Sequence, residues 1–176
     1  MKLSFSTNRW KNTSMADFFA MAKEYRFSGV EIHSIRDFGE KECSALYHEA
    51  NALRLSIACL DMGADIGADA DAAREELDAC ISAAQRLHTP YLRLRAEKGE
   101  DAVKKSEAFL AYALPKAKEA SLTLLIETVG AYADTGVLAD TLRLFADDSL
   151  GALWDVYYPY MEMGESAEAT IRNLGA

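Results

Sequence analysis

The stretch LTLLIET at residues 122–128 decides the fold, because it joins a buried strand to a charged residue at its end. Leucine and isoleucine fill four of the five positions 122–126. A near-continuous apolar run of this length is typical of a strand covered on both faces in a parallel sheet. Glu127 follows this run at the end of a buried strand, where water only partly solvates a carboxylate. A residue that merely covers the surface is not expected at such a place.

The same alternation of strand and helix extends from this stretch in both directions. Further strand-like runs are expected at 2–7, 30–33, 55–60, 91–95 and 150–156. Apolar residues at helical spacing predict helices at 14–25, 39–53, 71–88, 100–120 and 135–146, and from 166 to 174, whereas 159–164 is expected to be loop. Six strand-then-helix units in this order predict one α/β domain with parallel strands and right-handed crossovers.

Two architectures fit this order, an open doubly wound sheet and a (β/α)₈ barrel. The first strand–helix turn reads Thr7-Asn8-Arg9-Trp10, which lacks the glycines of a dinucleotide-binding turn. The barrel is favoured because nearly every predicted strand carries polar groups at its carboxyl end, where barrel enzymes hold their active sites. These groups belong to Ser6, Thr7, Glu31, His33, Asp61, Arg93, Arg95, Glu127 and Asp155.

Composition excludes several classes of protein. The 176 residues include 19 Lys and Arg against 28 Asp and Glu, a net charge of −9 that disfavours nucleic acid and anionic membrane surfaces as partners. No apolar run approaches the ~20 residues of a membrane helix, and no signal peptide is recognisable. Cys43, Cys59 and Cys80 show no CxxC spacing and are expected to be reduced thiols of a cytoplasmic protein.

Three segments resemble the xylose-isomerase-like barrels, a family with sugar-phosphate isomerases, epimerases and the endonuclease IV type of repair enzyme. They are SGVEIH at 28–33, LLIET at 124–128 and LWDVYYPYMEMGES at 153–166. The resemblance runs in register over essentially the whole chain. It implies a TIM-barrel-like fold in which residues 1–176 form a single incomplete barrel domain, with about six of eight βα units. It also leads us to expect a homo-oligomer, or completion of the sheet by another chain, since open sheet edges favour association.

The resemblance also implies a metal site and a catalytic residue. In such enzymes the Glu ending the fifth strand and the Asp ending the sixth bind a divalent metal, which corresponds to Glu127 and Asp155. Carboxylate ligands favour Mg²⁺ or Mn²⁺, with Co²⁺ or Zn²⁺ as alternatives. In the related epimerases the fifth-strand Glu also transfers a proton, so Glu127 is expected to be catalytic. Val129 and Tyr158 stand where family members often carry histidine, which argues against a site with several zinc ions.

Other polar and aromatic side chains at the strand ends are expected to bind substrate. Arginines on one face of a strand can bind a phosphate or carboxylate bidentately, or they can pair with neighbouring acids. Aromatic rings can stack on a sugar or belong to the core. The expected substrate-binding residues are Glu31, His33, Arg93, Arg95, Trp154 and Tyr158.

Two functional hypotheses follow. The first is a divalent-metal-dependent sugar or sugar-derivative isomerase or epimerase that transfers a proton through a metal-stabilised enediolate. The alternative is a non-catalytic barrel fragment that binds a ligand or a partner chain. Retention of Glu127 and Asp155 favours the first hypothesis, and the lost histidines and strands favour the second. The sugar itself is not specified, because barrel specificity resides in loops.

Overall fold

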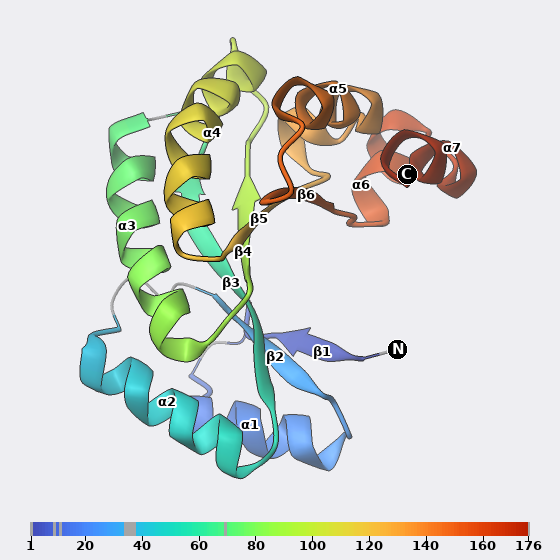
Figure 1. Cartoon of the computed structure of the whole chain (residues 1–176). Helices are drawn as coiled ribbons and strands as arrows, with labels where there is room; N and C mark the ends of the chain where they lie inside the picture. Colours follow the sequence, from blue (N-terminus) through green and yellow to red (C-terminus); the bar gives the residue numbers. More distant parts are fainter. Residues whose placement is uncertain (1, 9, 11, 34–37, 69, 176) are drawn as a thin grey trace.

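Six parallel strands form one open sheet in the order β1-β2-β3-β4-β5-β6 (Figure 1). The computed structural model describes residues 2–8, 10, 12–33, 38–68 and 70–175; Arg9 of the first strand–helix turn lies outside them. The predicted α/β fold with parallel strands is confirmed. The strands are β1 (Ser4–Ser6), β2 (Gly29–His33), β3 (Ser56–Asp65), β4 (Tyr91–Arg95), β5 (Thr123–Glu127) and β6 (Leu150–Leu153).

Helices connect successive strands and cover the outer face of the sheet, as Figure 1 shows for α1–α4. Ser14 accepts a hydrogen bond from the backbone N–H of Asp17 and caps the first helix. Within the described residues, no helix is both long enough and apolar enough to cross a membrane. The helices are α1 (Met15–Glu24), α2 (Glu40–Ala52), α3 (Ala70–Leu87), α4 (Ala102–Glu119), α5 (Thr135–Phe145), α6 (Tyr157–Met163) and α7 (Ala167–Leu174), with a 3₁₀ turn at Gly130–Tyr132.

The prediction of loop at 159–164 is wrong, because these residues lie largely in helix α6. Pro159 is the third residue of α6, in the first turn, where a proline costs no backbone hydrogen bond. Gly164 then ends the helix with a positive φ of 66°. The predicted strand at 150–156 is correspondingly shorter, since β6 ends at Leu153.

The two faces of the sheet differ in polarity. Val30 and Ile32 of β2 are fully buried on the outer face, beneath the helices, and they alternate with Glu31 and His33. Period-two alternation therefore directs Glu31 and His33 to the inner, concave face. The strands β4 and β5 repeat the pattern, so the outer face holds the apolar core and the inner face holds the polar groups.

A close backbone contact joins the loops that follow β4 and β5. Gly130 has a φ of +60°, and a methyl group on its Cα would lie 2.2 Å from the carbonyl oxygen of Ala96. The N–H of Ala131 donates to that same oxygen at 2.9 Å. Only glycine adopts this conformation readily and leaves room for the neighbouring loop.

We therefore expect Gly130→Ala to destabilise the protein by about 1–3 kcal/mol from backbone strain alone, before the steric clash is added. Gly99→Ala is the matched control, because Gly99 has no neighbouring atom within 4 Å of the position its Cβ would occupy. Urea unfolding of both variants measures the difference. Equal losses of stability in the two variants would contradict this account of Gly130.

Candidate active site

Arg93, on the inner face of β4, is the centre of an ionic network that joins three strands. Its Nε and Nη2 donate to the two carboxylate oxygens of Glu127 on β5, at 3.0 and 2.8 Å. Its Nη1 donates to Oε1 of Glu31 on β2 at 3.0 Å. The Arg93 side chain is only 13% exposed, so these contacts form in a largely desolvated place. A guanidinium bound bidentately by a carboxylate is among the strongest polar contacts in proteins.

Asp61 of β3 adds a third carboxylate, which is fully buried. Its Oδ2 forms a short contact with Nδ1 of His33. Its Oδ1 lies 3.9 Å from Nε of Arg93 and 3.8 Å from Nε of Arg95. Within the described residues this Oδ1 accepts no hydrogen bond, so the two arginines balance its charge without a direct hydrogen bond.

The register of the parallel strands explains why these groups meet. His33 is aligned with Asp61, and Asp61 with Arg93. Alternate residues of a strand share a face, and neighbouring strands lie about 4.8 Å apart, so polar groups in one row come into contact. Asp61 is not among the substrate-binding residues that the sequence predicts, although its place at a strand end was the signal that could have identified it.

The pKa values of two groups in the network, Glu127 and Arg93, are shifted from their ordinary values. Burial raises the pKa of Glu127 above its ordinary value, while Arg93 opposes the shift and Asp155 adds to it. Burial alone would lower the pKa of Arg93, but Asp61, Glu31 and Glu127 outweigh it and raise that pKa. A carboxyl with a raised pKa beside a cleft is typical of acid–base catalysis.

The network borders two hollows, and Arg93, Glu127 and Asp155 line both. The inner groove, about 1030 Å³, runs along the concave face of the sheet and also touches Glu31 and Trp154. The mouth hollow, about 990 Å³, lies past the strand ends. It is lined among others by Asn8, Arg95, Val129, Gly130 and Tyr158.

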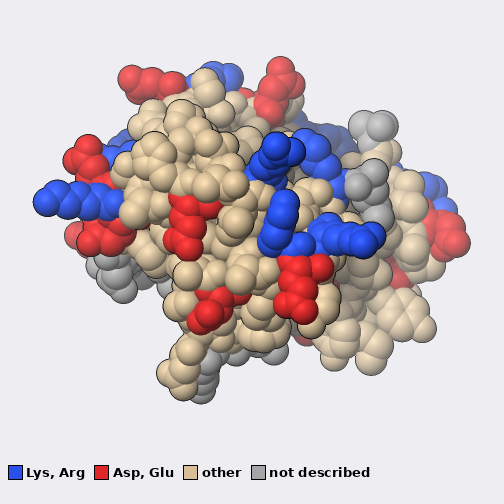
Figure 2. Space-filling model, turned by 90° about the horizontal axis from the view of Figure 1, so that it is seen from below, with Lys and Arg blue, Asp and Glu red and all other residues tan. Residues whose placement is uncertain are grey.

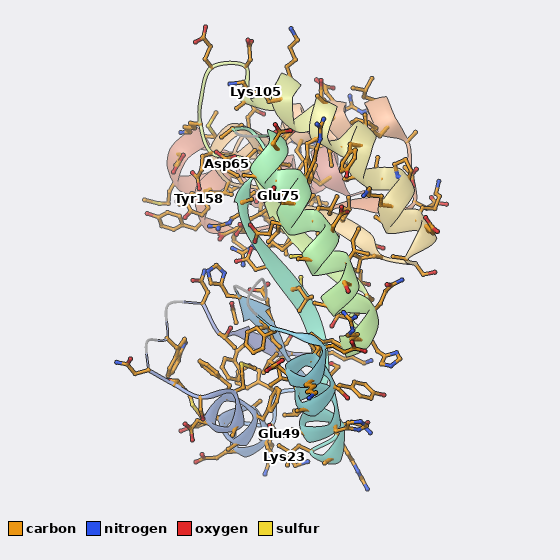
Figure 3. All side chains as sticks on the ribbon, turned by 90° about the vertical axis from the view of Figure 1, so that its left-hand side faces the viewer. Lys23, Glu49, Asp65, Glu75, Lys105 and Tyr158 are labelled. Carbon is orange, nitrogen blue, oxygen red and sulfur yellow. The ribbon has the colours of Figure 1, made fainter. Side chains whose placement is uncertain are left out.

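Of the six residues predicted to bind substrate, five line at least one of the two hollows, and His33 lines neither. Figure 3 shows Tyr158 and Asp65 toward one end of the molecule, with Lys23 and Glu49 at the opposite end. Trp154 is 37% exposed and faces the inner groove rather than the mouth hollow. The sequence therefore predicted a shared location, but not its division into two hollows.

The predicted metal ligands do not form a metal site in this arrangement. Both carboxylate oxygens of Glu127 accept hydrogen bonds from Arg93. Oδ1 of Asp155 accepts from the N–H of Tyr157 at 2.8 Å. In the described part of the chain, no three or more His, Cys, Asp or Glu side chains are grouped so that they could hold a metal ion. The donor set present does not fit a divalent ion, and the metal role of Glu127 and Asp155 stays a prediction.

Charges of both signs also mix on the outside of the molecule. On the face in Figure 2, several basic side chains gather near the middle, with acidic side chains directly beside them. Proteins that bind nucleic acid by its phosphates present a basic stripe. This face therefore offers mixed charge rather than a continuous basic surface.

The raised pKa of Glu127 predicts how stability depends on pH. Below pH 4.5, the ordinary pKa of glutamate, this group is protonated in both the folded and the unfolded chain. As the pH rises, the unfolded chain releases the proton first, so ionisation favours unfolding until the raised folded pKa is passed. The wild type should therefore lose stability relative to Glu127→Gln with rising pH, by at most about 1.4 kcal/mol per pH unit.

Urea unfolding from about pH 4 to about pH 8 measures this difference. Glu75→Gln is the control, because Glu75 is an exposed residue of α3, labelled in Figure 3. This variant should keep the pH dependence of the wild type. A wild type that gains stability over Glu127→Gln with rising pH would show that the folded pKa is lowered instead.

Comparison with known proteins supports the fold. No protein-family model and no curated protein matches the sequence. A probable 3-DHS dehydratase of Bacillus anthracis matches with a TM-score of 0.82 and 18% identity, over 99% of this chain and 69% of that one. A 3-keto-D-glucoside 4-epimerase of E. coli matches with a TM-score of 0.82 and 14% identity, over 98% and 75%. An AP endonuclease, family 2, of Brucella melitensis matches with a TM-score of 0.79 and 16% identity, over 98% and 75%.

Other solved structures with a similar fold are described as xylose isomerase domain proteins. At these identities the likeness concerns the fold, and the fold carries several chemistries. The comparison confirms the sequence-based expectation of a TIM-barrel-like arrangement. This chain has the fold of the xylose-isomerase-like TIM barrels, with its six strands in an open sheet.

Proposed function

We propose that this protein is an isomerase or epimerase of a small sugar or sugar derivative. Glu127 carries the proposal, as a buried carboxyl with a raised pKa that borders both hollows. Proteins of the same fold include a sugar epimerase and xylose isomerase domain proteins. The proposed location agrees with barrel enzymes in general, whose chemistry lies at the carboxyl ends of the strands.

In this proposal Glu127 transfers the proton. Its carboxylate removes a proton from the carbon next to the substrate carbonyl. The electron pair of that C–H bond forms the new C=C bond, and the π pair of the carbonyl moves to its oxygen, which gives an enediolate. The guanidinium of Arg93, 2.8 Å from Glu127, supplies positive charge for this oxygen. Return of this proton to the neighbouring carbon, with transfer of the hydroxyl proton from one enediolate oxygen to the other, completes an isomerisation. In an epimerisation, water donates a proton to the opposite face of the first carbon, and Glu127 releases the proton that it removed to solvent.

Residues around the two hollows bind the substrate in this proposal. Arg95 and Tyr158 line the mouth hollow, and Glu31 and Trp154 line the inner groove. Charged and aromatic side chains of this kind suit sugar hydroxyls and the apolar faces of a sugar ring. His33 is assigned an indirect role, because it contacts Asp61 and lines neither hollow.

The divalent metal that the family resemblance implies is not needed for this proposal. Glu127 and Asp155 would be its ligands, with Mn²⁺ or Mg²⁺ the favoured ions and Co²⁺ or Zn²⁺ the alternatives. Both carboxylate oxygens of Glu127 and one of Asp155 already accept hydrogen bonds, so no step is assigned to a metal here. We also propose a reducing compartment such as the cytoplasm, which is supported by three cysteines that are all buried and free.

A second candidate is a non-catalytic module that binds a partner chain or a second copy. The observation in its favour is the open sheet, in which β1 and β6 each pair with a single strand among the described residues. Large apolar side chains beside β6 are exposed as well. They are Trp154, Val156, Tyr157, Tyr160 and Met161. Unpaired strand edges of this kind promote association.

Proton exchange in D₂O tests the enzymatic proposal without knowledge of the exact sugar. The protein is incubated with a panel of aldoses, ketoses, sugar acids and sugar phosphates, and NMR follows loss of the C–H signal next to the carbonyl. We expect at least one sugar to exchange, and Glu127→Gln to slow that exchange by about 10²–10⁴-fold, the usual contribution of a general base.

Glu75→Gln is again the matched control and should exchange at the rate of the wild type. Equal rates in wild type and Glu127→Gln would remove Glu127 from the reaction. No exchange across the panel, combined with self-association in sedimentation experiments, would favour the binding module.

A further inference from the structure

The guanidinium of Arg93 lies among three carboxylates on the inner face of the sheet. The Arg93 guanidinium donates to Glu127 at 3.0 and 2.8 Å and to Glu31 at 3.0 Å. Its Nε lies 3.9 Å from Oδ1 of Asp61. One planar cation therefore faces carboxylates from three different strands.

We propose that Arg93 is the resident cation of this site and that it excludes a divalent metal from the carboxylates of Glu31, Asp61 and Glu127. The inference departs from what the family resemblance implies. It concerns what the site binds, so it stands independently of the proposed sugar chemistry.

The first argument is that the positive charge is permanent. A guanidinium does not lose its proton in proteins, and it matches carboxylates with several donors held in one plane. The carboxylates around Arg93 raise its pKa further, although burial opposes this effect. The Arg93 guanidinium therefore keeps its charge at every pH at which the protein is folded, and it does not leave the carboxylates by losing a proton.

The second argument is competition for the same oxygens. Glu127 is 3% exposed, and both of its oxygens are used by Arg93. A metal that bound Glu127 would have to break these two hydrogen bonds and then lie beside a buried cation of the same sign. Like charges in a poorly solvated place repel strongly, because little water is present to screen them.

The third argument is that removal of the Arg93 guanidinium should create a metal site. Replacing Arg93 with methionine keeps a flexible, unbranched side chain but removes the guanidinium and its charge. The buried carboxylates of Asp61 and Glu127 and the partly buried carboxylate of Glu31 would then lack their central cation, an arrangement that is costly unless another cation enters. Carboxylate oxygens are ligands that Mn²⁺ accepts.

The test is Mn²⁺ binding, followed by the EPR signal of the free ion and by thermal unfolding. The wild type should bind no Mn²⁺ saturably, and its melting temperature should be the same with Mn²⁺ and with EDTA. Arg93→Met should gain a saturable site. At a Mn²⁺ concentration of about 100 times Kd, its melting temperature should rise by about 5–10 °C.

Two controls show that the gained site is the one inferred. Arg93→Met combined with Glu127→Gln should lose the Mn²⁺ binding again. Arg143→Met removes an arginine from an exposed pair with Asp140 on α5 and should bind no Mn²⁺. If Arg93→Met does not fold alone, its refolding with and without Mn²⁺ replaces the titration, and recovery only with Mn²⁺ supports the inference.

Three results would overturn it. Saturable Mn²⁺ binding by the wild type that disappears in Glu127→Gln would show that Arg93 does not exclude the metal. A folded Arg93→Met that binds no Mn²⁺ would show that the carboxylates form no cation site. An unfolded Arg93→Met that Mn²⁺ does not rescue would show the same. None of these measurements uses turnover, so they are independent of the outcome of the exchange experiment.

Discussion

The contact between Arg93 and Glu127 is the interaction on which the inner face of this sheet depends. The charged groups of Arg93, Glu31 and Glu127 are mostly buried, and buried charges are costly unless they are paired. Here one guanidinium satisfies both oxygens of Glu127 and one of Glu31. Removal of Arg93 would take the guanidinium from both carboxylates at once, so β2, β4 and β5 are coupled through a single side chain.

Sheet geometry explains how this network coexists with a stable core. The same period-two alternation that directs Arg93 inward directs Leu92 and Leu94 outward, where they are fully buried beneath the helices. The outer face therefore supplies the apolar burial that stabilises the fold, while the inner face is left for polar groups. At the mouth of the site, the close contact between Gly130 and Ala96 holds the loop that follows Glu127 against the loop that follows β4.

The chemistry we propose uses the same contact. A carboxylate that must accept and return a proton needs a pKa near the working pH, and burial moves the pKa of Glu127 in that direction. Arg93 limits the shift and at the same time brings a fixed positive charge close to where a substrate oxygen would become negative. In this respect the guanidinium supplies part of what a metal ion supplies in other enzymes.

The fold was largely predictable from the sequence, and the site only in part. The apolar runs and the strand-then-helix order act locally, so they predicted the parallel α/β architecture and placed Glu127 at a strand end. Helix α6 was missed because Pro159 suggests loop unless its place in the first turn is known. Residues 61–65 were missed as strand because β3 continues into a segment that pairs with Arg95 only after a register shift.

What the sequence determined by itself is the set of polar groups that share the carboxyl edge of the sheet, since strand periodicity decides on which face and at which end a residue lies. Only the tertiary structure decided their partners. Arg93 and Glu127 are 34 positions apart in the chain, and Arg93 and Glu31 are 62 apart. Which carboxylate meets which guanidinium depends on strand order, register and curvature together, and these arise only when the sheet assembles.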